Sequence, residues 1–266
     1  MATHFISFAN TDYMLMDKIH KHAQSFNLFD TINLYNEGDI AELIERHPHF
    51  FALYKKRGFG LWMWKPYIIL KKLLTLNNGE ILFYIDAGSV LNVHGKSRFE
   101  EYLDLLLDEE NKVVAFQTSN YYKGFYYVKA DCVQSYFPNY YTYNLTCYYA
   151  GALLIKNSDF TRKLIKEWLG LCENENFIDS SPSKTYAEHE EFIGQDADNG
   201  LLNLVLGKFL VKYSMFGKII SIFPDEVSLC NSEGVQLVHS LDYSEFLQQD
   251  WSQHSSFPIQ FRRWRP

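Results

Sequence analysis

The sequence of 266 residues has no long hydrophobic run, and none of its stretches approaches the roughly 20 apolar residues that span a bilayer. Residues 1–7 lack the basic start and the long apolar stretch of a signal peptide. Cysteine is scarce: the four cysteines form no Cys-x-x-Cys pair, which disfavours a zinc site or a disulfide framework. We therefore expect a soluble, cytoplasmic protein with reduced thiols.

Positive charge is in deficit, with 25 Lys and Arg against 32 Asp and Glu and a formal net charge of −7. A protein that follows nucleic-acid phosphates needs a cationic face, so we expect no nucleic-acid partner. Repeats and linkers rich in Gly, Pro or Ser are also missing, which indicates one folded body. Aromatic residues are abundant at 17%, a composition that fits a bulky core or carbohydrate stacking.

Short apolar runs alternate with helical patterns along the chain. We expect strands over Phe5–Ala9, Thr31–Tyr35, Ile81–Ile85, Lys112–Phe116 and Tyr149–Ile155. Helices are expected over about residues 13–24, 39–54 with a break at Pro48, 66–76, 99–107, 159–172 after a Ser158 cap, and 197–211. This alternation predicts an α/β three-layer sandwich with a mostly parallel sheet. The expected division is a catalytic domain over 1–225 and a C-terminal extension over 226–266 that packs on it.

Asp86 follows the most apolar of the expected strands, and Gly88 comes two residues later. In open α/β sheets, ligands bind beyond the carboxyl ends of the strands. A carboxylate buried there needs compensation, which a divalent cation bridging to a diphosphate would provide. Gly88 would let such a group approach the backbone closely. A solvated aspartate in a turn after a strand explains the same residues equally well.

The segment Arg57–Pro66 reads RGFGLWMWKP and combines glycines, tryptophans and cations. Lys65 lies beside the expected helix N-terminus, whose free N–H groups favour anions. Arg57 adds a cation with the bidentate geometry that phosphates accept. We expect these two side chains to receive a diphosphate, and Trp62 and Trp64 to be core anchors.

The Arg57–Pro66 segment, followed by Ile81–Gly88, resembles a group of bacterial and viral glycosyltransferases of the GT-A fold. Three further matches are similar to segments of the glycogenin and lipopolysaccharide galactosyltransferase relatives. They are a first-strand turn over Phe8–Tyr13, a strand over Tyr149–Leu154 and a helix start over Asp198–Asn203. The similarity covers roughly residues 5–210. It differs at Asp86-Ala87-Gly88, where relatives carry D-x-D, and at Asn199, where they carry Gln.

The resemblance implies transfer of a sugar, from a nucleoside diphosphate donor of the UDP type, to a hydroxyl of a glycan or lipid-linked acceptor, with retention. It implies donor-binding roles for Phe8, Asp12, Tyr13, Arg57, Lys65, Asp86 and Gly88. It places Tyr149 and Gly151 on the acceptor side and Asp198 and Asn199 beside the anomeric carbon. Manganese or magnesium would bind Asp86, with His254 or His239 as a late ligand.

Several alternatives stay open at this stage. Inversion would need Glu191, Asp196 or Asp198 as a general base. A nucleotidyltransferase would need a glycine-rich phosphate loop after the first strand, where this chain has Asn10-Thr11-Asp12. A non-catalytic glycan- or nucleotide-sugar-binding protein also explains the aromatic content. The basic tip, residues 262–265, suits either a peripheral contact with an anionic membrane or a solvated tail.

Overall fold

The computed structural model describes residues 1–11, 16–91, 93–117, 123–143, 145, 147–212, 219–222 and 259–260. The strands are β1 (Thr3–Phe8), β2 (Thr31–Tyr35), β3 (Ile81–Ile85), β4 (Val90–Leu91), β5 (Val113–Gln117), β6 (Tyr148–Lys156), β7 (Ile219–Ile222) and β8 (Ile259–Gln260). The α-helices are α1 (Met16–Phe26), α2 (Ala41–Arg46), α3 (Pro48–Leu53), α4 (Gly58–Leu61), α5 (Trp64–Leu73), α6 (Lys96–Leu105), α7 (Ala130–Tyr136), α8 (Asp159–Cys172), α9 (Glu175–Ile178) and α10 (Ala197–Lys212).

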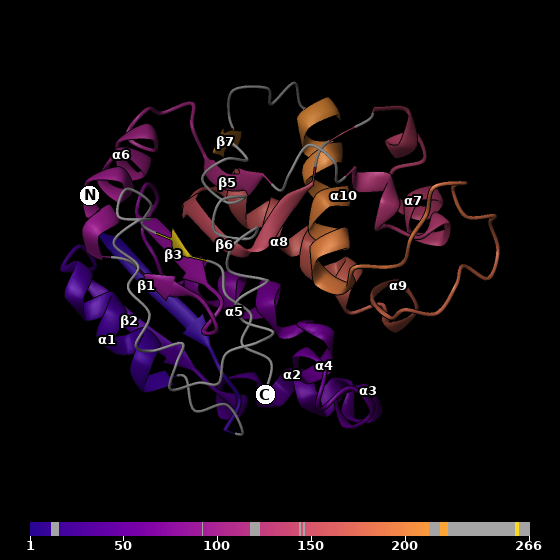
Figure 1. The fold of residues 1–266 in the computed structure, drawn as a ribbon, viewed down its shortest axis with the longest axis horizontal. Helices are drawn as coiled ribbons and strands as arrows, with labels where there is room; N and C mark the ends of the chain where they lie inside the picture. Colours follow the sequence, from indigo (N-terminus) through magenta and orange to yellow (C-terminus); the bar gives the residue numbers. More distant parts are fainter. Residues whose placement is uncertain are drawn as a thin grey trace.

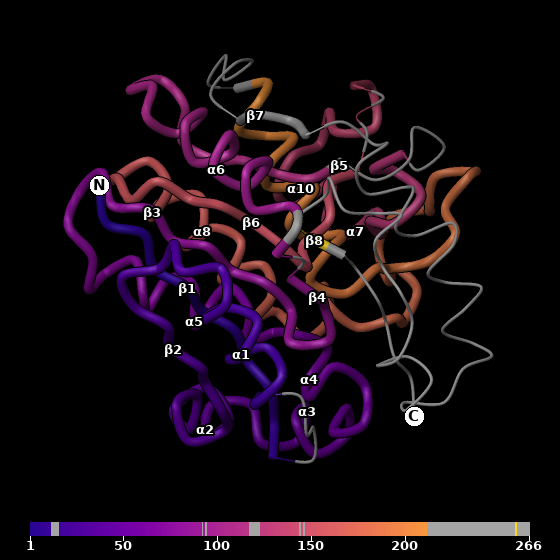
Figure 2. The backbone as a smooth tube through the Cα atoms, turned by 60° about the vertical axis from the view of Figure 1, so that its left-hand side comes forward, coloured from indigo at the N-terminus to yellow at the C-terminus, as the bar shows by residue number. Residues whose placement is uncertain are grey.

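Six strands form one sheet in the order β2-β1-β3-β6-β5-β7, which runs from bottom to top in Figure 2. The β1–β2, β1–β3 and β5–β7 pairs are parallel. Strand β6 is antiparallel to both of its neighbours, β3 and β5. The sheet is therefore mostly parallel, with one reversed strand in its middle. This confirms the predicted fold class.

Helices cover both faces of the sheet, as its alternating side chains require. In β3, Leu82 and Tyr84 belong to the core on one face, together with side chains of α5, α8 and α10. Ile81, Phe83 and Ile85 belong to the core on the other face, together with side chains of α1 and α6. Figure 1 shows α1 and α6 on the opposite side of the strands from α8 and α10. The result is the expected three-layer arrangement.

Several predicted elements occur within three residues of their expected bounds. β2 and β3 have the predicted limits, and Ser158 caps α8 by accepting a hydrogen bond from the Thr161 N–H. Helix α5 begins at Trp64, two residues before the predicted start at Pro66, and ends at Leu73. The proline still lies in the first turn, where its missing N–H leaves no bond unmade.

Little of the predicted C-terminal extension lies within the described residues. Within 226–266 the structure describes Ile259 and Gln260, which form β8. This strand pairs antiparallel with β4, which begins four residues after Asp86. A segment close to the C-terminus therefore lies beside the turn that follows β3. No helix in the described part of the chain combines the length and apolarity needed to cross a membrane.

Candidate functional site

The carboxyl end of β3 carries the first two groups of the candidate site. Because side chains alternate along a strand, Tyr84 and Asp86 lie on the same face as Leu82, the face that α5 and α10 cover. The Asp86 backbone N–H donates to the carbonyl of Gly151 in β6 at 2.8 Å. Its side chain is 23% exposed, so this carboxylate is accessible at the edge of the sheet.

Lys65 of α5 reaches this carboxylate from the helix layer. Its ammonium Nζ lies 3.3 Å from Asp86 Oδ1 and 2.8 Å from Asp198 Oδ2. The Lys65 and Asp198 side chains are only 3% and 4% exposed. Three segments far apart in the sequence thus meet at one ammonium: the start of α5, the end of β3 and the start of α10. We call Lys65, Asp86 and Asp198 the charged cluster.

Burial and mutual attraction set the ionisation of the charged cluster. Desolvation alone would lower the pKa of Lys65, but attraction to Asp198 and Asp86 more than offsets it, so the pKa lies above its ordinary value. Desolvation raises the pKa of Asp198 to about 7, because the Lys65 ammonium opposes it only in part. Lys65 therefore stays charged at neutral pH, and Asp198 is the group that titrates there.

Tyr84 also holds the accessible carboxylate of Asp86 in place. Its hydroxyl donates to Asp86 Oδ1, the oxygen that also faces Lys65. The ring is fully buried, and desolvation, with the nearby Asp86 charge, raises the pKa of the phenol well above its ordinary value. The phenol is therefore a donor to Asp86 across the neutral range. Asp86 is therefore held through Oδ1, by the Tyr84 hydroxyl and the Lys65 ammonium.

Asn199, the second predicted catalytic residue, is bonded to neighbouring protein groups. Its Oδ1 accepts from the Ala150 N–H at 2.6 Å, and its Nδ2 donates to Asp196 Oδ2 at 2.8 Å. One turn later, Asn203 accepts from the Tyr148 N–H and donates to the Tyr148 carbonyl. These two amides attach the start of α10 to the start of β6. Asp198 immediately precedes Asn199, so this attachment also fixes its backbone.

The two residues predicted for the acceptor side are packed against each other. A Cβ on Gly151 would lie 2.1 Å from the Tyr149 ring, so the ring occupies the space that glycine leaves. Tyr149 is half-buried, and it lies close enough to Lys65 and Tyr84 to contribute to raising the pKa of both. The structure therefore brings Tyr149 to the edge of the charged cluster.

The remaining predicted donor residues are placed differently from one another. Phe8 is 4% exposed, and its ring stacks on Trp64 at a centroid distance of 4.0 Å, inside the core. Arg57 is exposed, and its guanidinium forms no ion pair with any other described residue. Gly88 lies half-buried in the turn after Asp86. Asp12, Tyr13, His239 and His254 lie outside the described residues.

The described residues do not by themselves make a metal site. Among them, His, Cys, Asp and Glu side chains form no group of three that could hold an ion. Asp86 Oδ1 is engaged by Lys65 and Tyr84, and Asp198 Oδ2 is engaged by the same ammonium. A metal on Asp86 would therefore need ligands from outside the described residues.

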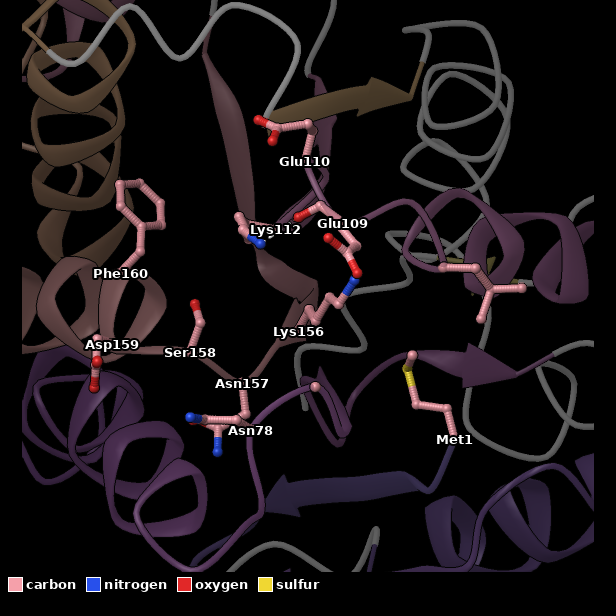
Figure 3. A pocket seen from close by; sticks show the side chains of 12 residues that line it. Met1, Asn78, Glu109, Glu110, Lys112, Lys156, Asn157, Ser158, Asp159 and Phe160 are labelled. Carbon is pink, nitrogen blue, oxygen red and sulfur yellow. Dashed lines mark hydrogen bonds between the residues drawn. The ribbon is translucent and has the colours of Figure 1, made fainter.

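A hollow lies away from the charged cluster, at the amino end of β3. This open depression of about 700 Å³ is lined by residues at the amino ends of β3 and β5 and the carboxyl end of β6, as Figure 3 shows. Its two lysines already donate to backbone carbonyls, Lys112 to Glu109 and Lys156 to Asp108. Neither the charged cluster nor Tyr84 lines it.

Two residues of the site escaped sequence reasoning. Tyr84 could have been found from the alternation of β3, since it lies two positions before Asp86 and shares its face. Asn203 lies one helical turn after Asn199, a spacing that places both amides on one side of α10. The contact of Lys65 with two carboxylates left no such signal, because it joins residues 21 and 133 positions apart.

The chain is similar to known proteins in structure but not in sequence. No protein-family model and no curated protein matches the sequence. The chain is similar to a glycosyltransferase involved in the glycosylation of the major capsid of PBCV-1, with 11% identity, TM-score 0.47, and 97% and 93% of the two chains covered.

Two further structures show the range of these likenesses. The galactosyltransferase LgtC, solved with donor and acceptor sugar analogs, has 12% identity, TM-score 0.41, and 97% and 86% of the two chains covered. The 4-diphosphocytidyl-2C-methyl-D-erythritol synthase from Anaerococcus prevotii has 9% identity, TM-score 0.36, and 83% and 88% covered. At such identities the likeness concerns the path of the backbone.

Proposed function

We propose that this protein is a glycosyltransferase, which moves a sugar from a nucleoside diphosphate donor to a hydroxyl of a glycan or lipid-linked acceptor. The observation that carries the proposal is the charged cluster at the carboxyl end of β3. Burying an ammonium between two carboxylates costs free energy of folding, because the charges lose their hydration. Groups with perturbed pKa values are concentrated at functional sites.

The charge of the cluster suits a sugar better than a bare phosphate. The Lys65 ammonium and the Asp86 carboxylate cancel, so the cluster is neutral while Asp198 is protonated and carries one negative charge once Asp198 ionises. In neither state does the cluster attract a diphosphate. Sugar hydroxyls are neutral donors and acceptors, and hydrogen bonds to a carboxylate are among the stronger ones. We infer that Asp86 Oδ2 accepts from a hydroxyl of the donor sugar, while Lys65 and Tyr84 hold the carboxylate in place.

Asp198 is the second carboxylate that we place near the donor sugar in the proposed site. Its carboxylate touches Lys65, and its backbone carbonyl accepts from the Trp168 indole N–H at 2.9 Å. A pKa of about 7 lets it exchange a proton near neutrality. We propose that Asp198 and Asn199 lie beside the anomeric carbon and that the reaction proceeds with retention. A negative group there stabilises an oxocarbenium-like centre.

The diphosphate needs positive charge from elsewhere. Arg57 is exposed and free of carboxylate partners in the described part of the chain, so we propose that it contacts the phosphates of a UDP-type donor. Asp12 and Tyr13 stay proposed for the nucleoside. A divalent ion, Mn²⁺ or Mg²⁺, would supply further positive charge if His254 or another ligand joined Asp86.

A panel of nucleotide sugars tests the proposal directly. UDP-glucose, UDP-galactose, UDP-N-acetylglucosamine and GDP-mannose are screened by thermal shift, with Mn²⁺ or with a chelator. A ligand at 100 times its dissociation constant should stabilise the protein by about 2.7 kcal/mol. Slow release of free sugar from the binding donor, without acceptor, then distinguishes an enzyme from a binding protein. The anomeric configuration of the product decides between retention and inversion.

The role of Asp86 is tested with a matched pair of variants. Asp86→Asn removes the acceptor charge that a sugar hydroxyl would use, at a cost of about 1.5–3 kcal/mol of binding, or roughly tenfold or more in affinity. Asp104→Asn changes an exposed aspartate of α6 and should bind like the wild type. Equal affinity of Asp86→Asn and Asp104→Asn would remove the charged cluster from the proposed site.

A further inference from the structure

Five consecutive residues before Lys65 have left-handed backbone conformations. The φ angles of Gly58, Phe59, Gly60, Leu61 and Trp62 are 62°, 47°, 82°, 53° and 61°. We call Gly58–Trp62 the left-handed turn. L-residues other than glycine pay about 1–2 kcal/mol each in this region, and they visit it singly as a rule. Three of these five residues carry side chains, so this backbone is strained.

Close packing holds the left-handed turn in place. A Cβ on Gly58 would lie 2.4 Å from the Trp62 indole, and one on Gly60 would lie 2.7 Å from the Phe51 ring. The Gly58 carbonyl accepts from the Trp62 N–H at 3.0 Å and from the Trp64 indole N–H at 2.9 Å. The two glycines are required because aromatic rings occupy the space that side chains would need. Such strain persists where the surroundings impose it, and it clusters at ligand sites.

The turn sets the position of Trp62. Its ring centroid lies 6.0 Å from Lys65 Nζ, the ammonium at the centre of the charged cluster. Trp64 is 4% exposed and Trp168 is fully buried, whereas Trp62 is only half-buried. Trp62 therefore packs against the core from its border and is not fully enclosed, whereas Trp64 is the buried core anchor that the sequence predicts. A right-handed turn would direct the side chain of residue 62 elsewhere, because handedness decides the direction of each Cα–Cβ bond.

We propose that Trp62 is a specificity-determining residue, whose indole packs against the apolar C–H face of the donor sugar. This inference rests on the proposed function and adds to it the residue that recognises the sugar as opposed to the nucleotide. A pyranose ring presents hydroxyls around its edge and C–H groups on its faces. Asp86 and Lys65 suit the edge, and an indole beside them suits a face. The left-handed turn holds that indole in place before the donor binds.

The test compares a nucleotide sugar with the nucleotide alone. Binding of UDP-glucose and UDP is measured by titration calorimetry for the wild type, Trp62→Phe and Trp62→Leu. Trp62→Leu should weaken UDP-glucose binding about tenfold and leave UDP binding within twofold, with Trp62→Phe between wild type and Trp62→Leu. UDP-glucose should also change the tryptophan fluorescence of the wild type, and this change should be lost in Trp62→Phe.

A pair of glycine variants tests whether the position of the Trp62 indole matters, with the residue itself unchanged. Gly58→Ala forces the indole to move, whereas Gly79 has a φ of 90° with nothing near its Cβ position and lies at the opposite end of β3. Gly58→Ala should weaken UDP-glucose binding severalfold, and Gly79→Ala should bind like the wild type. If Trp62→Leu does not fold, the fluorescence of Trp62→Phe and this glycine pair decide the matter.

The outcomes distinguish this inference from the proposed function. Native UDP-glucose affinity in the Trp62 variants, or an equal loss of UDP affinity, would overturn the role of Trp62 while leaving glycosyl transfer intact, provided that Asp86→Asn still impairs binding. A wild type that binds no member of the nucleotide-sugar panel would overturn the proposed function, and the role of Trp62 with it.

Discussion

Replacing Lys65 by Met should destabilise the protein, and increasingly so as the pH rises. The substitution keeps the volume of the side chain but leaves the buried Asp198 carboxylate without its counter-charge. Removing one partner of a buried ion pair costs about 3–5 kcal/mol, because the remaining charge is uncompensated. The protein can avoid that cost only by protonating Asp198, so the cost depends on pH.

The pKa of Asp198 fixes the pH window. In the wild type, burial raises this pKa to about 7 from 3.8 in the unfolded chain. The native state therefore holds a proton there that the unfolded state releases, and this group's contribution to stability falls as pH rises between about 4 and 7. Without Lys65 the native pKa rises further. Above pH 7 the variant should then lose about 1.4 kcal/mol per pH unit relative to the wild type.

Thermal unfolding at several pH values measures this effect. Two pH units above neutrality correspond to roughly 3 kcal/mol, or about 6–12 °C in melting temperature for a chain of this size. We expect the difference between the wild type and Lys65→Met to be smallest at pH 6 and largest at pH 9. Lys65→Met/Asp198→Asn removes the titrating carboxylate, so its difference from the wild type should not grow with pH. A single-variant difference that is equal at pH 6 and pH 9 would refute the reasoning.

Two other substitutions test how the strands and helices around the cluster are joined. Gly151→Ala places a methyl group against the Tyr149 ring and should cost about 1–3 kcal/mol of unfolding free energy, measured by urea denaturation. The control is Gly170→Ala on α8, where nothing lies near the added Cβ. Asn203→Ala removes the amide that bonds the Tyr148 N–H and carbonyl, and it should cost a similar amount of unfolding free energy. Wild-type stability of Asn203→Ala would show that water replaces the amide.

The layered fold could be predicted from the sequence because the signal is local. Continuous apolar runs such as Ile81–Ile85 mark strands covered on both faces, and Ser158 marks a helix start by its own hydrogen bonding. The reversal of β6 could not be predicted, because a buried strand reads the same in both directions. The left-handed turn was also missed, since two glycines indicate a bend but not five consecutive positive φ angles.

The site was predictable in its members more than in its contacts. Asp86, Lys65 and Asp198 were each expected at a site, and the structure brings them together. The sequence predicted that Lys65 binds a diphosphate, yet its ammonium contacts two carboxylates. That pairing depends on how α5 and α10 lie over the sheet, which is decided by the packing of side chains far from the site. Asp12, Tyr13 and His254 stay predictions.

The charged cluster is hard to explain as a device for stability. An ammonium and a carboxylate that are both at least 96% buried lose their hydration, and well-packed apolar residues in their place often give an equally or more stable protein. Tyr84 adds a third buried polar group, and the left-handed turn beside it adds backbone strain. All these costs fall within one small region at the carboxyl end of β3. A ligand that uses the exposed edge of Asp86 accounts for that concentration, whereas folding alone gives no reason for it.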